Sequence, residues 1–234
     1  MSALARRLFH RLPVTAFLRD QLRVEVRAAR VAVENRVHPA KRRTLRQLHD
    51  QHGVFVNVAC GPHPLPGFVN LDLFSMGPGT VTWDCRQQLP FATSSVRGIR
   101  TEHFFEHLEA FEEVPSFLAE ARRVLMPGGV MRIIVPHTPR FLEAYFTEGR
   151  AGFDALAVPD PFPEDHPTRM DILNHVFHQR HEHRWGYDVE SLTDRLHRAG
   201  FTDVREMSYG QSLDPTLARD LPQHAPYSLY VDAR

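Results

Sequence analysis

From Gly53 onward, short apolar runs alternate with turns and with stretches of helical spacing. Helical patterns occur at residues 114–125 and 189–199, and strand patterns occur at residues 54–58, 68–71, 80–83, 96–100, 130–135, 203–207 and 227–231. Strands that alternate with helices are typical of a parallel sheet covered by helices. We therefore predict an α/β fold with a doubly wound, mostly parallel, seven-stranded sheet.

The connections between the first three predicted strands are short. About seven residues separate the first two strands and about eight separate the next two, whereas a helical crossover needs about 10–12 residues or more. Full-length helices do not fit in either place, so these first crossovers are shortened and one face of the sheet lacks part of its usual cover. We expect the helical segment that precedes Gly53 to cover that face.

The first 50 residues differ from the rest in charge. They hold twelve Lys/Arg and four Asp/Glu, whereas the remaining residues hold 16 basic and 24 acidic side chains in a chain of formal net charge +0. Helical patterns run over residues 4–12, 15–37 and 39–49. We predict a basic helical arm over residues 1–50 and a catalytic domain over residues 51–234.

Three roles for the arm remain open. It could consist of amphipathic helices that pack on the domain, or it could place an interfacial helix on anionic lipid, chiefly through residues 1–14. The third alternative is an organellar transit peptide, against which Asp20, Glu25 and Glu34 argue because such peptides are poor in acids.

The composition is that of an ordinary soluble protein, with 42% hydrophobic and 24% charged residues. No apolar run reaches the roughly 20 residues of a membrane span. The two cysteines, Cys60 and Cys85, are too few for a disulfide framework, and we expect free thiols, with a pair as the alternative. We expect a cytoplasmic protein, with peripheral contact at the inner membrane surface as the alternative, and the sequence leaves the oligomeric state open.

Groups that suit a nucleoside-like ligand follow the first four predicted strands. In open α/β sheets, ligands bind beyond the carboxyl ends of the strands. Small residues let a ligand approach the backbone, an acid suits ribose hydroxyls, and a polar residue suits an adenine edge. In chain order the strands are followed by Ala59-Cys60-Gly61, Asp72, Asp84-Cys85 and Thr101-Glu102-His103. Each group alone could be a turn or a helix cap.

The order of five motifs resembles class I S-adenosylmethionine-dependent methyltransferases, closest to a bacterial branch similar to methyltransferase type 11. The motifs are residues 57–62, 83–84, 89–91, 102–107 and 123–129. The resemblance implies a Rossmann-like fold and S-adenosylmethionine as cofactor, with its methionine end after the first strand, its ribose at the acid after the second and its adenine beside the residues after the third. The predicted cofactor-binding residues are Asn57, Ala59, Cys60, Gly61, Pro62, Asp72, Leu73, Asp84, Cys85, Glu102 and His103.

The first loop departs from the pattern of these enzymes. It has one glycine at its start, Gly61, followed by the proline-rich residues 62–66, where relatives have two or three glycines. A glycine-poor loop with no room for a helix disfavours phosphate binding at a helix N-terminus and favours a cofactor that lacks phosphates.

Histidines supply the candidate catalytic groups. The sulfonium of S-adenosylmethionine needs no activation, so a base is required only when the acceptor is a hydroxyl or a protonated amine. His103 and His107 are four residues apart, which places them on one helix face. We predict His103 as base or acceptor-positioning group, and the alternative is a structural motif of Glu106 and His107.

A second group of histidines lies at residues 174–185. A metal site could be drawn through His178, His181 and His183, but no cysteine or well-spaced carboxylate completes it, so we predict no metal. We expect His183 to line the acceptor pocket. His137, at the end of the fifth strand, is a further candidate, and exposed loop histidines are the alternative.

We predict methyl transfer from S-adenosylmethionine to a small-molecule or glycan acceptor, with oxygen favoured. The alternative is an inactive methyltransferase fold that serves as a binding or scaffold protein. The missing Gly-x-Gly-x-x-Gly disfavours a nucleotide-cofactor oxidoreductase. The acidic body, without interleaved basic and aromatic residues, disfavours nucleic acid as a partner.

Overall fold

A computed structural model describes residues 15–74, 77–147, 150–156 and 168–234. Within these ranges the chain forms a seven-stranded sheet of order β3-β2-β1-β4-β5-β7-β6, in which β7 runs antiparallel to both of its neighbours and β1 to β5 pair in parallel. The predicted mostly parallel, Rossmann-like sheet is confirmed. The strands are β1 (Val54–Val58), β2 (Phe68–Asp72), β3 (Thr80–Thr82), β4 (Val96–Glu102), β5 (Leu125–Pro136), β6 (Val204–Met207) and β7 (Ser228–Ala233).

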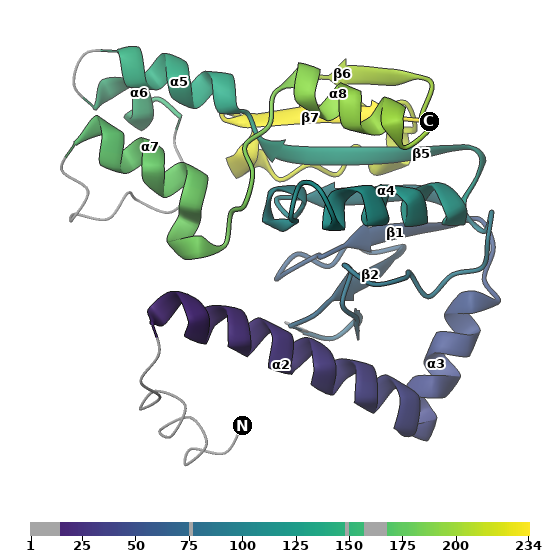
Figure 1. Cartoon of the computed structure of the whole chain (residues 1–234). Helices are drawn as coiled ribbons and strands as arrows, with labels where there is room; N and C mark the ends of the chain where they lie inside the picture. The colour runs from purple at the N-terminus through teal and green to yellow at the C-terminus, as the bar shows by residue number, and fades with distance from the viewer. Residues whose placement is uncertain (1–14, 75–76, 148–149, 157–167) are drawn as a thin grey trace.

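One face of the sheet is covered by α4 (Glu113–Val124) and α8 (Val189–Arg198), which lie side by side in Figure 1. Both helices were predicted from their apolar spacing, and α4 buries Phe117, Leu118 and Ala121 against the sheet. This face forms the main apolar core, and it holds the side chains of alternate residues along the strands.

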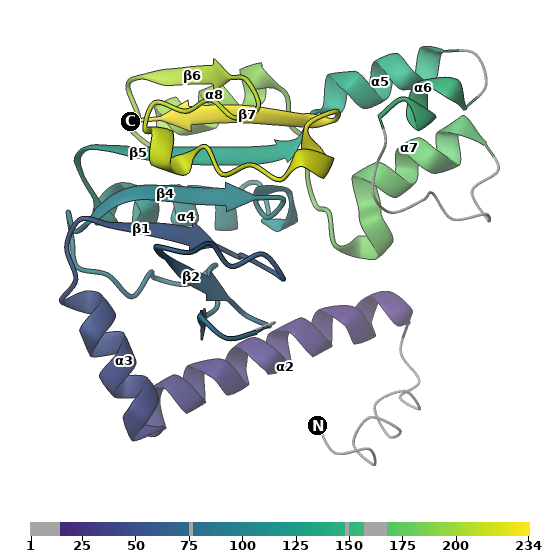
Figure 2. The ribbon, with the colours of Figure 1, turned by 180° about the vertical axis from the view of Figure 1, so that it is seen from behind.

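The opposite face lacks crossover helices in the described residues, since residues 59–67 and the described part of 73–79 form turns. Figure 2 shows the molecule from behind, with this face toward the viewer. The connection between β6 and β7 crosses the face and contains η3 (Pro215–Leu217) and η4 (Pro222–His224). Leu217 is fully buried against β4, close to Gly98, where an added Cβ would lie 3.0 Å from the leucine. We expected the arm to cover this face, but over β4 the cover comes from the connection between β6 and β7.

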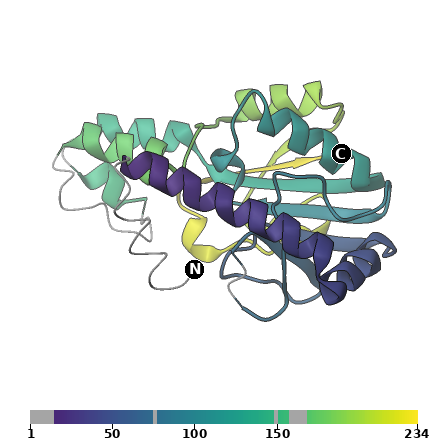
Figure 3. The ribbon, with the colours of Figure 1, turned by 60° about the horizontal axis from the view of Figure 1, so that its bottom comes forward.

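The arm packs against the domain through its two described helices, α2 (Ala16–Val37) and α3 (Pro39–His49). Figure 3 shows α2 crossing the molecule diagonally in front of the sheet. Asn35 donates to the carbonyl of Thr82, next to the β3 edge, and Leu48 of α3 is buried in the main core. The predicted helix at residues 4–12 and lipid contact at residues 1–14 lie outside the described residues. None of the described helices has both the length and the hydropathy of a membrane span.

Between β5 and α8, a small helical unit projects beyond the carboxyl end of β5, as Figures 1 and 2 both show. It contains α5 (Thr138–Phe146), α6 (Ala151–Asp154) and α7 (Arg169–His178), followed by η2 (Gln179–His181). Phe141, Phe153 and Ile172 form its separate apolar core. These helices were not predicted from the sequence.

Candidate functional site

A cavity of about 610 Å³ lies at the carboxyl ends of β1 to β4, within the range of roughly 300–1,000 Å³ typical of ligand pockets. One wall, here called the strand end, comes from residues that follow the strands. The other wall, called the histidine end, comes from His103, Phe104, His107, Leu108, His181, Glu182 and Arg184, and α2 closes the cavity between the two walls. The residues of the strand end are Ala59, Gly61, Pro62, Asp72, Leu73, Asp84 and Cys85.

The first turn of the strand end has a tightly curved backbone. Ala59 and Gly61 both have a φ of 51°, in the left-handed region where residues other than glycine are rare. A Cβ added at Gly61 would meet nothing within 4 Å, which shows that open space adjoins the backbone at this position. The turn thus exposes its backbone to the cavity, as close approach of a ligand requires.

Asp72 ends β2 and is 8% exposed. Its Oδ2 accepts from the backbone N–H of Gly61 at 2.9 Å, and its Oδ1 accepts from that of Phe74 at 2.6 Å. These bonds fix the carboxylate in the cavity wall. Each oxygen keeps a further lone pair, so the group can still accept hydrogen bonds from a ligand.

Asp84 also lines the cavity, but its carboxylate already has a partner. Arg86 donates from Nε to Oδ1 at 3.0 Å and from Nη2 to Oδ2 at 2.9 Å, and its Nη1 reaches Glu25 of α2 at 2.6 Å. Arg86 thereby links the strand end to the helix that closes the cavity. The sequence analysis did not identify Arg86.

Three of the predicted cofactor residues, Asn57, Cys60 and Glu102, do not line the cavity. Asn57 and Glu102 point to the sheet face beneath the β6–β7 connection, where Arg100 donates to Asn57 Oδ1 at 3.1 Å and also pairs with Glu102. Glu102 further contacts Nδ1 of His224 at 2.9 Å. Side chains alternate between faces along a strand, and this alternation directs both residues away from the cavity.

Both cysteines are free and buried. The Cys60 thiol lies 3.7 Å from Thr80 Oγ1, and Cys85 lies in the cavity wall. Burial raises the pKa of each thiol.

The helix α2 contributes a wall that the sequence did not reveal, because no local motif marks it. Gln21 accepts from Arg184 Nη2 at 2.6 Å, and the ring of Phe17 meets that of His181 edge-on at 5.2 Å. Arg23 lies 5.9 Å from the Phe74 ring. Asp20, Gln21, Arg23 and Val24 line the cavity from this helix.

His103 and His107 both line the cavity, and His183 lies directly behind His107 with ring centroids 4.9 Å apart. His103 adopts a φ of 52°, and its Nε2 lies 2.8 Å from Ser228 Oγ. His137 follows β5 and is held by a backbone hydrogen bond to Tyr227, outside the cavity lining. The structure therefore places His103 in the cavity lining, whereas His183, which we expected to line the acceptor pocket, lies behind His107 and outside the lining.

Burial controls the charges at the histidine end. It holds the pKa of His103 well below its usual value, with further lowering by neighbouring His224 and His183. Burial also lowers the pKa of His107 to about 3 and that of His183 to about 4. For Glu106, burial raises the pKa to about 8. The imidazoles are thus neutral at pH 7, which leaves a nitrogen lone pair on each ring.

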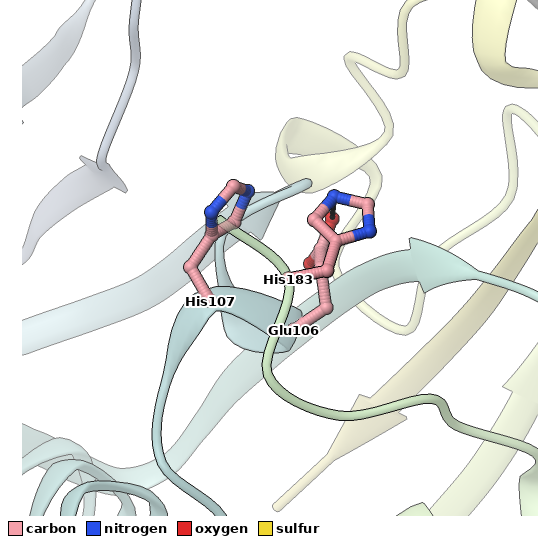
Figure 4. A group of neighbouring side chains, drawn as sticks. All are labelled: Glu106, His107 and His183. Atoms are coloured by element: carbon pink, nitrogen blue, oxygen red, sulfur yellow. Dashed lines mark ion pairs between the residues drawn. The ribbon is translucent and has the colours of Figure 1, made fainter. Parts of the chain in front are cut away.

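One group of side chains has the composition of a metal site. Ligand atoms of Glu106, His107 and His183 all lie within 4.8 Å of one another. Figure 4 shows the Glu106 carboxylate beside the His183 ring and His107 next to them. The set drawn in the sequence analysis was different, because it joined His183 to His178 and His181.

The methyltransferase-domain family matches residues 34–206 of the chain. The chain belongs to this family and is an S-adenosylmethionine-dependent methyltransferase of class I. The family match begins within α2. A comparison with curated proteins finds no match.

Among solved structures, the chain is similar to an S-adenosylmethionine-dependent methyltransferase from Archaeoglobus fulgidus, with 16% identity, a TM-score of 0.47 and coverage of 88% of this chain and 93% of the other. It is also similar to the Burkholderia thailandensis 1,6-didemethyltoxoflavin-N1-methyltransferase with bound 1,6-didemethyltoxoflavin and S-adenosylhomocysteine, with 13% identity, a TM-score of 0.45 and coverage of 95% and 91%. A Mesorhizobium loti S-adenosylmethionine-dependent methyltransferase gives 18% identity, a TM-score of 0.43 and coverage of 84% and 98%.

Proposed function

We propose that this enzyme methylates an oxygen atom of a polar small-molecule or glycan acceptor, which binds at the histidine end while the cofactor binds at the strand end. The observation that carries the proposal is that one cavity is lined by Asp72 and the Ala59–Gly61 turn on one side and by His103 on the other.

The strand end fits S-adenosylmethionine. The buried Asp72 carboxylate suits two ribose hydroxyls, and the open space at Gly61 suits the methionine portion of the cofactor. Leu73 and Cys85 offer apolar surface for adenine. The pairing of Asp84 with Arg86 limits its role at the adenine edge, because both carboxylate oxygens already accept charged hydrogen bonds.

The bound cofactor supplies an electrophilic methyl group, and the protein supplies position, exclusion of water and a proton acceptor. His103 lines the cavity with a partly buried imidazole, so it can take the proton that an acceptor hydroxyl loses as its oxygen is methylated. The nearby wall is polar, with Asp20, Gln21 and Arg184, which favours an acceptor with several hydroxyl groups.

We also propose that the arm of residues 1–50 completes the active site of the domain at residues 51–234. Four residues of α2 line the cavity, and Glu25 reaches Arg86 across it. Peripheral membrane contact through residues 1–14 remains a separate proposal, which liposome sedimentation of the chain with and without those residues tests.

The function is tested in two stages. Calorimetric titration should give binding of S-adenosylmethionine and S-adenosylhomocysteine and no binding of NAD. Release of S-adenosylhomocysteine is then measured with matched panels of hydroxyl and amine acceptors. Turnover confined to amines would overturn the oxygen assignment, and lack of binding of either sulfur cofactor at about millimolar concentration would overturn the site.

A further inference from the structure

We propose that Glu106, His107 and His183 bind a divalent transition-metal ion, with Zn²⁺ as the best match. The three side chains offer one carboxylate oxygen and two imidazole nitrogens within 4.8 Å of one another. Neither the order of the cofactor motifs nor the proposed acceptor role accounts for this arrangement.

The Glu106 carboxylate is the first observation that points to a ligand. It is 1% exposed, and neither oxygen accepts a hydrogen bond from another described residue. The nearest cation-forming groups are His103 Nδ1 at 3.4 Å and His183 Nε2 at 3.8 Å, both too far for strong hydrogen bonds. A buried carboxylate without partners is costly unless an ion or a proton compensates its charge.

The two histidines provide a second, independent observation. His183 Nδ1 lies 2.7 Å from the carbonyl oxygen of Val176, and this bond makes Nδ1 the donor and leaves the lone pair on Nε2, the atom that faces Glu106. His107 lies beside the backbone of Glu182. Metal-binding histidines almost always donate their second N–H as His183 does, because the bond sets the tautomer and the orientation of the ring.

The donor set and the spacing define the class of ion. Two imidazoles and one carboxylate suit Zn²⁺, whereas Mg²⁺ and Ca²⁺ prefer oxygen atoms alone. Ligands of four-coordinate Zn²⁺ lie about 2.0–2.1 Å from the metal, so two of them are roughly 3.3–3.4 Å apart. The 3.8 Å between Glu106 and His183 needs only a small closing movement, and the widest pairs in the group, within 4.8 Å, need a larger side-chain adjustment.

The ion would link two chain segments that form the histidine end of the cavity. Glu106 and His107 belong to η1 (Phe105–His107) beyond β4, whereas His183 follows η2, between Glu182 and Arg184 of the histidine end. Backbone hydrogen bonds from Arg184 and Trp185 to the Glu106 carbonyl, at 2.8 and 3.3 Å, already join these segments. Of the three ligands only His107 lines the cavity, so the ion would lie in the wall.

The test uses the full chain after dialysis against a chelator, with Zn²⁺ titrated by calorimetry and Co²⁺ followed by its visible absorption. We expect one ion per chain and tetrahedral Co²⁺ bands. Loss of a second-shell partner costs roughly 10–100-fold in metal affinity, so E106Q and H183Q should each weaken binding by at least about 100-fold. H178Q is the matched control, because His178 is an exposed histidine of the same region, and it should bind as the wild type does.

Two results would overturn the proposal: the absence of a Zn²⁺ site in the wild type at micromolar concentration, or equal affinity in E106Q and the wild type. Circular dichroism establishes that each variant is folded. If E106Q does not fold, H183Q alone decides, and Co²⁺ bands of unchanged intensity in that variant would equally overturn the site.

Discussion

The strand end and the histidine end of the cavity are built from different kinds of contact. At the strand end, the bond between Gly61 and Asp72 joins residues 11 positions apart. At the histidine end, the bond between Gln21 and Arg184 joins residues 163 positions apart. Successive strand ends form the first wall wherever the parallel sheet forms, whereas the second depends on docking of α2 and of the helical unit between β5 and α8. This difference explains why the cofactor is evident from motifs while the acceptor is not.

The comparison also separates two functions. Substitutions at the strand end should change affinity for the cofactor, and those at the histidine end should change turnover. Substitutions in the contacts that join the ends should change mainly how fast ligands leave.

The largest effect is expected from His103→Asn. If this imidazole accepts the acceptor's proton, kcat should fall by about 10²–10⁴-fold, the usual contribution of a general base, with cofactor affinity nearly unchanged. Asparagine is chosen because it tolerates the left-handed backbone at this position, where φ is 52°. Steady-state release of S-adenosylhomocysteine and calorimetry measure the two quantities.

The matched control is His137→Asn, which changes the same residue type outside the cavity lining and should leave kcat unaltered. Equal kcat in His103→Asn and the wild type would remove His103 from the mechanism. A large loss of cofactor affinity in that variant would break the separation of the two ends.

The next effect is the loss of cofactor affinity in Asp72→Ala. Hydrogen bonds to a charged group contribute about 1.5–3 kcal/mol each, so loss of the carboxylate should raise the Kd for S-adenosylmethionine by at least about 100-fold. Calorimetry with the cofactor and with S-adenosylhomocysteine measures the change.

Asp20→Asn serves as the control, because Asp20 lines the same cavity from α2. It should leave the Kd within about threefold, or about 0.7 kcal/mol. An unchanged Kd in folded Asp72→Ala would mean that the ribose does not bind at this carboxylate.

A smaller effect is expected where the two ends are joined. Glu25→Gln weakens the ion pair with Arg86, and because the Glu25 side chain is 56% exposed, the pair contributes only about 0.2–1 kcal/mol. Release of S-adenosylhomocysteine, followed by stopped flow, should become up to about fivefold faster at low salt, and the difference should shrink at high salt.

Glu34→Gln is the control on the same helix, because Glu34 pairs with Arg30 and Lys41 within the arm. If Glu25→Gln and Glu34→Gln release the product at the same rate, the contact between α2 and Arg86 does not govern release.

The fold was largely predictable because burial imposes a strong pattern on its central elements. The run at residues 130–135 lies within β5, and the apolar spacing at residues 114–125 corresponds to α4. The helices α5 to α7 escaped prediction because their small apolar core is shared among short segments, as the contact of Phe141 and Phe153 with Ile172 illustrates. No single segment there carries a complete helical pattern.

The site was predictable only where local sequence fixes it. Asp72 follows β2 directly, so its place beside the first turn could be inferred. Asn57 and Glu102 were chosen by the same argument, but their side chains point to the other face and form a network with Arg100. The position of a motif correctly predicts at which end of a strand a residue lies. The face of the sheet to which its side chain points depends on the register of the strand and on the segment that covers that face.

The pairing of Glu106 with His183 illustrates the limit more sharply. Within residues 174–185 no cysteine or well-spaced carboxylate completes a metal site with the histidines. The carboxylate comes from η1, 77 positions earlier in the chain, and the docking of the segment after η2 brings it within 3.8 Å of His183. Spacing rules cannot detect ligands that different elements contribute.

The smallest effect on binding and turnover is expected at Asp188, which lies outside the lining of both ends and therefore tests stability alone. Asp188 caps α8 by accepting from the backbone N–H of Ser191 at 2.8 Å. Loss of an N-cap costs about 1 kcal/mol, so Asp188→Ala should lower Tm by roughly 2–4 °C at pH 7, with cofactor affinity and kcat unchanged. Asp188→Asn should keep the cap, because asparagine caps helices about as well as aspartate.

The hydrogen bonds from Ser191 lower the pKa of Asp188, so the contribution of its charge to stability is present above the unfolded pKa of about 3.9. This contribution is lost as the pH falls through the lower folded value. The Tm advantage of the wild type over Asp188→Asn should therefore shrink between about pH 5 and pH 2, as scanning calorimetry measures. A change in cofactor affinity at pH 7 in either variant would show that the stability of α8 is coupled to the cavity, and the separation between its two ends would then need to include this helix.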